Sequence, residues 1–466
     1  MRLHHLREWL LANVDEISLI NNLTLPIFSG GYGSTTFFPA AQITRYFPFI
    51  ASFPEYRYIG VLFNAVGMIF FYAGLRNICN RPAAFLGALL FSTHWYLIYI
   101  SRVYEIATLI PFFFSIVFYL FTGWLVHARD YLLPLLFFLG GIGLDCYAPP
   151  MAYSLSALLV VLLVGALQKT LRWRWILMSL LGLLVAILPF VYVQLFVGNF
   201  FGDILANYHH AASPRLQVTL IHLAKPSIFF STLSELMTFL TLQHCWKPLV
   251  LPAITLVLLP IYPVARLRHN RNVFMLALWT YLTLVITFFS PVAAYIQGHF
   301  TGFLILYCAL LAALLGAAEP ICRRLSWPAA MLLVIFSLYW MPIIRQNQHR
   351  DVAWLPDYIR AERLATVPVS DGAYLVLKHT PFLQGDDFPV FLCNSTEEIV
   401  GSLAALPPQQ LRLVIATFNC DIAGAADRLG MIIGKEQRIT TLYESYLAEG
   451  IAFYFLEEPK GTADTS

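Results

Sequence analysis

The chain has 466 residues, of which 59% are hydrophobic, 15% aromatic and only 12% charged. Soluble domains are roughly 45 to 50% apolar and about 25% charged, so this composition indicates an integral membrane protein. The net charge of +3 and the lack of a long basic run argue against nucleic-acid binding. The seven cysteines include no CxxC spacing, which argues against a disulfide scaffold and a thiolate zinc site.

Residues 1–57 precede the first long apolar segment and contain two adjacent carboxylates, Asp15 and Glu16, in NVDEIS (13–18). A stretch rich in Gly, Pro and aromatic residues follows them. Long loops of this kind between membrane segments are usually functional. Solvated loop acids are the alternative interpretation of the pair.

Segments of bilayer length follow, since about twenty helical residues cross a hydrocarbon core of roughly 30 Å. We predict helices, because barrel strands would alternate in polarity and open strand edges cannot be satisfied in lipid. The expected transmembrane region is 58–344, which includes a loop at 198–247. About ten spans are predicted, at 58–77, 83–100, 106–126, 131–148, 151–167, 174–197, 248–266, 273–291, 300–318 and 326–344.

The connections between spans differ in charge. One alternate set carries most of the basic residues, namely Arg76, Arg81, Arg129, Lys169, Arg172, Arg174, Arg266, Arg268, Arg271, Arg323 and Arg324. By the positive-inside tendency this set is cytoplasmic, which places 1–57, 101–105, 198–247 and the tail after 345 outside. Residue 1 would then lie outside, so we expect either a further helix upstream of it or a tail that crosses unaided.

Residues 345–466 have shorter apolar runs, which predict strands at 374–379, 388–393, 411–418 and 451–458 with helical stretches between them. We expect a small extracytoplasmic α/β domain. Cys393 and Cys420 each end a predicted strand. They would be a disulfide if those strands were parallel neighbours, and two buried thiols otherwise.

A second acidic site occurs in SRVYEIA (101–107), where Arg102 and Glu105 are three residues apart at the start of a helix and share one face. Charged groups there are costly unless they are paired or line a wet cavity. The alternative interpretation is a surface ion pair of little energetic value.

The order of these features resembles the GT-C superfamily of membrane glycosyltransferases, especially its family 39 branch of protein mannosyltransferases and aminoarabinose transferases. The resemblance covers roughly residues 10 to 320 and rests on the acidic pair, the Gly/Pro/aromatic loop, YRYIGVLFNAVGMIFFYAGLRNICNR, ISRVYEIA, GLDCYAPPMAYSLSALLVVLL and GHFTGFLILYCALLAALLG. Two features depart from the family pattern. No helix precedes the acidic pair, and His299 with Phe300 stands where Arg or Lys followed by Tyr is usual.

The resemblance implies a polyprenyl-phosphate sugar donor and a hydroxyl-bearing acceptor, which is a protein, a lipid or a glycan. It implies Asp15 as general base, Glu16 as second candidate and Glu105 as the second acidic position. A carboxylate whose pKa is raised by desolvation can take a proton from a hydroxyl, and cations stabilise the leaving phosphate. The donor-phosphate candidates are Arg57, Arg102, Lys225, Lys247 and His299, with His209 and His210 as possible acceptor or phosphate contacts.

No metal is expected, although a divalent cation held by Asp15 and Glu16 is the alternative. The expected location is the bacterial inner membrane, with the site on the periplasmic or extracellular face. A transporter or flippase of lipid-linked sugars also has many spans with few charges. We favour the enzyme because the acids gather at one face and no repeated half is visible. An inactive GT-C-like scaffold is the remaining alternative.

Overall fold

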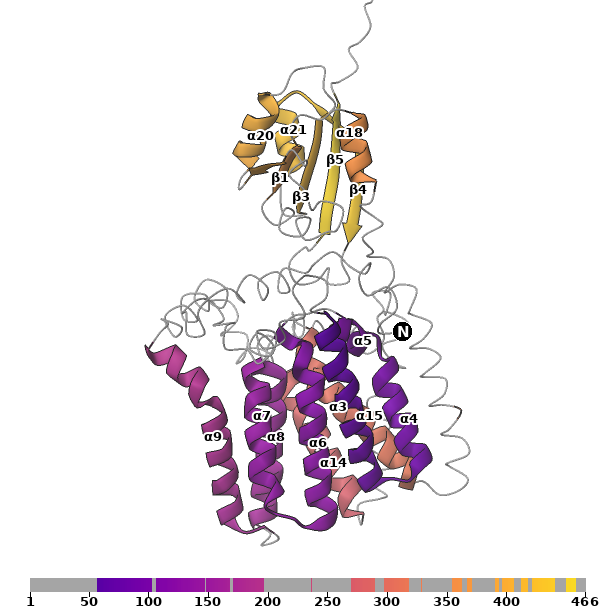
Figure 1. The fold of residues 1–466 in the computed structure, drawn as a ribbon, viewed down its shortest axis with the longest axis vertical. Helices are drawn as coiled ribbons and strands as arrows, with labels where there is room; N and C mark the ends of the chain where they lie inside the picture. Colours follow the sequence, from indigo (N-terminus) through magenta and orange to yellow (C-terminus); the bar gives the residue numbers. More distant parts are fainter. Residues whose placement is uncertain are drawn as a thin grey trace, which may run out of the picture. The chain divides into compact units, whose positions relative to one another are not determined.

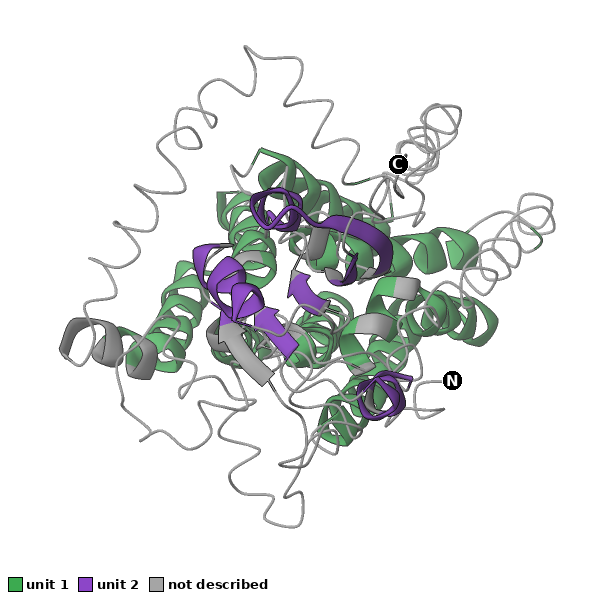
Figure 2. Cartoon of the chain, turned by 90° about the horizontal axis from the view of Figure 1, so that it is seen from above, with its two compact units in different colours: residues 1–4, 19–341 green, residues 5–18, 342–466 purple. Residues whose placement is uncertain are grey.

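The structure is a computed structural model whose described residues form two compact units, one with residues 57–328 and one with residues 354–457 (Figure 2). It describes residues 57–102, 106–146, 148–167, 171–196, 236, 270–289, 297–317, 328, 354–362, 367–370, 390–393, 396–405, 412–417, 421–440 and 450–457. Residues 1–57, except Arg57, and the predicted spans at 248–266 and 326–344, except residue 328, lie outside this described part.

The first unit is a bundle of apolar helices that stand side by side (Figure 1). Four of the described helices are long and apolar enough to cross a membrane, and three more have shorter apolar stretches. The elements are α3 (Arg57–Ile78), α4 (Arg81–Thr93), α5 (Trp95–Arg102), η2 (Ile106–Leu109), α6 (Ile110–His127), α7 (Leu132–Cys146), α8 (Ala148–Leu167), α9 (Trp173–Phe196), α14 (Arg271–Phe288), η3 (Gln297–Phe300) and α15 (Thr301–Ala317).

One predicted span differs in detail. The sequence predicts a single helix at 83–100, whereas the structure breaks it between α4 and α5 at His94. The backbone of His94 is extended, with φ −63° and ψ 128°, so it cannot continue the helix. Its ring Nδ1 accepts the backbone N–H of Tyr96 at 3.3 Å, which supplies a partner for an N–H at the start of α5. The break is therefore built into the local hydrogen bonding.

Helices α3 and α6 pack closely and run parallel. A Cβ added to Gly67 would lie 2.8 Å from the Cα of Phe112, and one added to Gly74 would lie 2.8 Å from the ring of Phe118. From the first contact to the second, the chain advances by about two turns along α3 and by about two turns along α6, in the same direction. Small residues allow helix backbones to approach without a side chain between them. Glycine at these two places therefore sets the spacing of the pair.

The starts of α6, α8 and α15 lie at one end of the bundle. Gly302, next to the first residue of α15, is so close to Ser154 and Pro150 of α8 that a Cβ would overlap the Ser154 hydroxyl, and Phe114 of α6 is 3.2 Å from the same point. At the far end of α15, a Cβ on Gly316 would be 2.7 Å from the Cβ of Cys79, which follows α3. The end of α3 is thus at the far end, and its first residue, Arg57, is at the end shared with Gly302.

We call the end of the bundle near Gly316 the basic end. Its connections and helix termini carry exposed arginines, namely Arg81, Arg129, Arg172, Arg174 and Arg271. These are residues that the charge pattern assigned to one side of the membrane, and the structure places them at one end of the bundle. The exposed apolar residues Leu177, Leu181, Leu184 and Leu188 follow one face of α9, as expected for contact with lipid.

The second unit contains α18 (Leu355–Ala361), β1 (Val367–Ser370), β2 (Val390–Cys393), α20 (Thr396–Ala404), β3 (Arg412–Thr417), α21 (Ile422–Arg428), β4 (Ile432–Thr440) and β5 (Gly450–Glu457). The strands form one sheet in the order β2-β1-β3-β5-β4. The pairs β1–β2 and β1–β3 are parallel, and β5 is antiparallel to both β3 and β4. Strand β5 alternates, with Ala452, Tyr454 and Leu456 in the core beneath α20 and α21.

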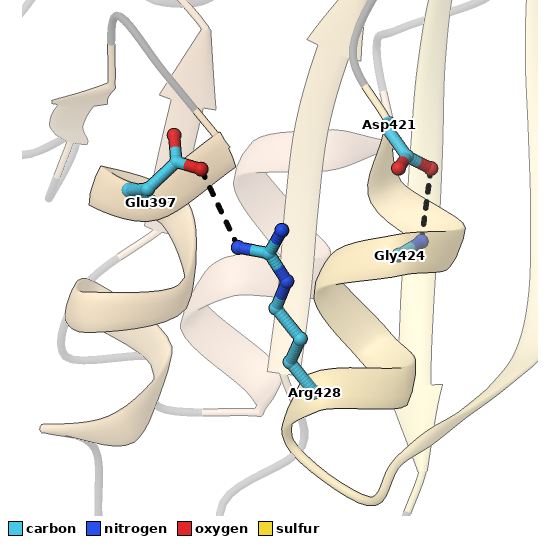
Figure 3. Close-up of polar contacts among 4 residues, drawn as sticks. All are labelled: Glu397, Asp421, Gly424 and Arg428. Carbon is cyan, nitrogen blue, oxygen red and sulfur yellow. Dashed lines mark hydrogen bonds and ion pairs between the residues drawn. The ribbon is translucent and has the colours of Figure 1, made fainter.

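The other face of the sheet is covered by α18. The Trp354 ring lies 5.2 Å from the Phe453 ring, and the Tyr358 ring lies 5.4 Å from the Phe455 ring. On the first face, α20 and α21 are joined by an ion pair in which a guanidinium nitrogen of Arg428 lies 3.4 Å from a carboxylate oxygen of Glu397 (Figure 3). Both faces of the central strands are therefore packed.

The structure changes two expectations for this unit. Strands β1 and β4 were not predicted, and β4 begins at Ile432, inside a stretch at 421–434 that was expected to be helical. The condition for a Cys393–Cys420 disulfide, that their strands are parallel neighbours, is also not met, and Cys393 is a buried thiol. The physical reason is the strand order: β1 lies between β2 and β3, so the two strand ends are about 9.6 Å apart at a spacing of roughly 4.8 Å per strand. Cys420 and the strand predicted at 374–379 lie outside the described residues.

Candidate functional site

Three predicted site residues are placed by the structure, and all three are at the end of the bundle opposite the basic end. Arg57 is the first residue of α3, Arg102 is the last residue of α5, and His299 lies in η3 directly before α15. Helix α3 packs against α5 and η2, and η3 packs against α8, α14 and α15. Segments far apart in sequence therefore bring these residues to one end, as the charge pattern predicted.

Arg57 is completely buried, with 0% of its surface exposed. The guanidinium group stays charged under all ordinary conditions, so it cannot escape the cost of burial by losing its proton. A charge in such a place is costly unless it is paired or lines a polar cavity. Its burial distinguishes Arg57 from the exposed arginines of the basic end and marks it as the strongest described candidate for an anion contact.

His299 is 2% exposed and lies before the apolar helix α15. Its ring meets Tyr153 of α8 edge to face, with the ring centroids 5.9 Å apart. Burial lowers the pKa of His299 to about 3, because the charged imidazolium is disfavoured away from water. At neutral pH the ring is therefore uncharged, and it would contact a phosphate as a hydrogen-bond donor and not as a cation.

Sequence reasoning missed two polar residues near this end. Asn64 is fully buried in α3, and its side-chain nitrogen donates to the carbonyl oxygens of Gly60 and Thr108, each at 2.8 Å. His94 is also buried, at the junction of α4 and α5. The signal in the sequence is a polar side chain inside an apolar segment, as for Asn64 in GVLFNAVGM.

The remaining predicted site residues lie outside the described part of the chain. They are Asp15, Glu16, Glu105, His209, His210, Lys225 and Lys247, and the side chain of Arg102 is also not described. Among the described residues, no group of three His, Cys, Asp or Glu side chains is placed to hold a metal ion. The alternative metal site at Asp15 and Glu16 is outside that search.

No protein-family model matches the chain, and no curated protein sequence matches it either. Among solved structures, the chain is similar to the crystal structure of ArnT from Cupriavidus metallidurans bound to undecaprenyl phosphate. The TM-score is 0.55, and the match covers 96% of this chain and 94% of that chain at 12% sequence identity. The chain has an ArnT-like fold.

This likeness confirms the fold that the order of sequence motifs predicted. At 12% identity the likeness shows a similar fold and does not assign roles to individual residues. It extends over nearly the full length of both chains, so the helical bundle and the C-terminal unit are both included in the match.

Proposed function

We propose that the protein is an integral membrane glycosyltransferase that moves a sugar from a polyprenyl-phosphate donor to a hydroxyl group of an acceptor. The observation that carries the proposal is the full-length likeness to ArnT, whose crystal structure contains undecaprenyl phosphate. The buried Arg57 at the start of α3 supports it, because a guanidinium group can bind the oxygens of a phosphate.

In the proposed reaction, a carboxylate takes the proton of the acceptor hydroxyl, and the hydroxyl oxygen forms a bond to the anomeric carbon of the sugar. The bond between that carbon and the phosphate oxygen breaks, and the polyprenyl phosphate leaves with the bonding electrons. We assign the proton transfer to Asp15, with Glu16 as its neighbour and Glu105 as the second acidic position. No proton is needed by the leaving phosphate.

The departing phosphate gains negative charge as the bond breaks, and positive groups or oriented N–H donors lower the barrier. We assign this role to Arg57 and Arg102, because the planar guanidinium can contact two phosphate oxygens at once. His299 would add a neutral donor, and Lys225, Lys247, His209 and His210 are further proposed contacts. The reaction needs no metal in this scheme; Mg²⁺ or Mn²⁺ bound by Asp15 and Glu16 is the alternative.

We place the reaction on the extracytoplasmic face of a bacterial inner membrane. The basis is the positive-inside tendency, which assigns the basic end to the cytoplasm and Arg57 to the other side. The acceptor would then be a protein, lipid or glycan of the cell envelope. The acceptor has to be identified by experiment.

The test is to incubate the purified protein in lipid nanodiscs with radiolabelled polyprenyl-phosphate sugars and a membrane extract as acceptor source. We expect label to move to an acceptor, and the transfer to be lost in Asp15→Asn. Label that crosses the membrane of a proteoliposome while still attached to its carrier would instead support a flippase. A protein that neither transfers nor moves label, with every carrier sugar tried, would favour the inactive scaffold.

A further inference from the structure

We infer that Asn64 is a positioning residue for this reaction: its carboxamide ties the η2 turn to α3 and thereby holds the chain that contains Arg102 and Glu105 in register with Arg57. The inference rests on the proposed function. The hydrogen bonds that the structure describes for Asn64 go to backbone carbonyl oxygens of α3 and η2, so its effect would pass through the backbone.

The tie is a hydrogen bond between elements that are distant in sequence. Asn64 lies in α3, and its Nδ2 donates at 2.8 Å to the carbonyl oxygen of Thr108, which belongs to η2 and is 44 residues further along the chain. The second hydrogen of the same NH₂ group goes to Gly60 O at 2.8 Å, inside α3. Both donors of the amide are therefore used, and one of them fixes η2 to α3.

The tie lies close to the proposed site on both sides. Arg57 precedes Asn64 by seven residues, which is two helical turns on the same face and a rise of about 10 Å. Glu105 immediately precedes η2, and Thr108 is the third residue after it. A shift of η2 along α3 would therefore move the acidic position relative to the buried guanidinium.

Stability of the bundle does not account for the amide. Asn64 Oδ1 is buried, and it has no hydrogen-bond partner among the residues that the structure describes. A buried acceptor without a partner costs free energy, and Asn is a poorer helix former than Leu. A leucine of similar volume would avoid both costs. What the amide adds is its hydrogen bond to η2.

Helix α3 also contains a residue that serves as a control. Asn77, near the basic end of α3, donates from Nδ2 to the hydroxyl oxygen of Thr122 in α6 at 3.2 Å. It is the same residue type on the same helix, and its amide donates to a side chain of α6 instead of to the backbone of η2. It is far from the proposed site, so Asn77→Leu should reproduce any general loosening of the α3/α6 pair without moving η2.

The experiment compares Asn64→Leu and Asn77→Leu in the full-length protein in nanodiscs. Hydrogen exchange followed by mass spectrometry reports the amides of residues 106–112, and steady-state transfer reports kcat and the donor KM. For Asn64→Leu we expect at least tenfold faster exchange in 106–112 and about a tenfold lower kcat, with the donor KM changed less than twofold. For Asn77→Leu we expect wild-type exchange in 106–112 and a kcat within twofold of wild type.

Each outcome decides the inference. Unchanged exchange at 106–112 in Asn64→Leu would show that the tie does not hold η2. An equal loss of kcat in both variants would show a general packing effect, and an unchanged kcat in an active enzyme would overturn this inference alone. If the unaltered protein transfers no sugar, the proposed function fails and the positioning role fails with it, while the exchange data still report whether Asn64 holds the turn.

Discussion

The two ends of the helical bundle carry the same kind of residue in opposite surroundings. At the basic end, Arg81, Arg129, Arg172, Arg174 and Arg271 are exposed. At the other end, Arg57 is 0% exposed. Exposed arginines cost little because water solvates them, and their placement orients the chain in the membrane. A buried arginine has lost its shell of water, so its charge has to be met by polar groups around it.

This contrast between the two ends predicts that removing a charged side chain lowers the rate of sugar transfer only at the end that contains Arg57. It would fail if residues at the basic end proved as important for transfer as those at the opposite end. The following experiments test it in order of expected effect.

The largest effect is expected from Asp15→Asn, which removes the proposed proton acceptor and keeps the size of the side chain. General-base catalysis contributes about 10²- to 10⁴-fold, so transfer should fall by that factor while thermal unfolding stays unchanged. The measurement is the initial rate with a radiolabelled carrier sugar. Glu16→Gln is measured alongside, and a loss confined to Glu16→Gln would move the base to that residue.

The next effect is expected from Arg57→Gln compared with Arg76→Gln, since both arginines belong to α3. Removing one positioned donor from a developing anion typically costs about 10²- to 10³-fold in rate. Arg57→Gln should show such a loss. Arg76 is only partly buried and donates to the carbonyl oxygen of Cys79 at 3.1 Å, so Arg76→Gln should keep transfer within about twofold. Equal losses in the two variants would remove the distinction between the ends.

The buried His299 predicts that the folded protein is sensitive to acid. Burial lowers the pKa of His299 to about 3, from an ordinary value of 6.5. The unfolded chain therefore takes up this proton first as the pH falls, so the folded state should lose stability from pH 6.5 downward. Thermal unfolding at pH 7.5 and pH 5.0 measures the loss, which should be smaller in His299→Gln.

The matched control for this pH experiment is His127→Gln. His127 is the exposed last residue of α6, at the basic end. This variant should lose as much stability as the unaltered protein between the two pH values. If His299→Gln also lost as much as the unaltered protein, the buried imidazole would not be responsible for the acid sensitivity.

The smallest effect is expected where charge is solvated in the second unit. The Glu397 and Arg428 side chains are 72% and 58% exposed, so Glu397→Gln should change local stability by less than about 0.5 kcal/mol. Asp421→Ala should cost about 1 kcal/mol, because Asp421 Oδ1 accepts the Gly424 N–H at 2.9 Å at the start of α21 (Figure 3). Hydrogen exchange of the β3 amides measures both. A larger effect from Glu397→Gln than from Asp421→Ala would contradict this view of exposed charge.

Much of the bundle could be predicted because helix formation in a membrane depends on local composition. The segments at 58–77, 131–148 and 174–197 are helices with nearly the predicted bounds. The break at His94 was not predicted, because it depends on one ring nitrogen accepting a nearby N–H. In the second unit, β4 was missed because its charged residues, such as Lys435 and Glu436, give no apolar run, and the strand is defined by its pairing with β5.

The candidate site was predictable only in part. Counting spans and sorting the connections by charge placed Arg57, Arg102 and His299 at one end. The same reasoning gave no means of recognising that Arg57 is fully buried or that Asn64 contacts Thr108. The assignments of Asp15, Glu16 and Glu105 remain predictions for the experiments above.

The sequence by itself determined that this is a polytopic membrane protein and which helix ends share a side, because hydrophobicity, span length and the distribution of arginine are properties of local segments. Only the tertiary structure decided that α3 lies parallel to α6, that Asn64 meets a turn 44 residues away, and that β1 separates Cys393 from β3. These features arise from the packing of segments that are distant along the chain, where the close approach of two backbones fixes which groups meet.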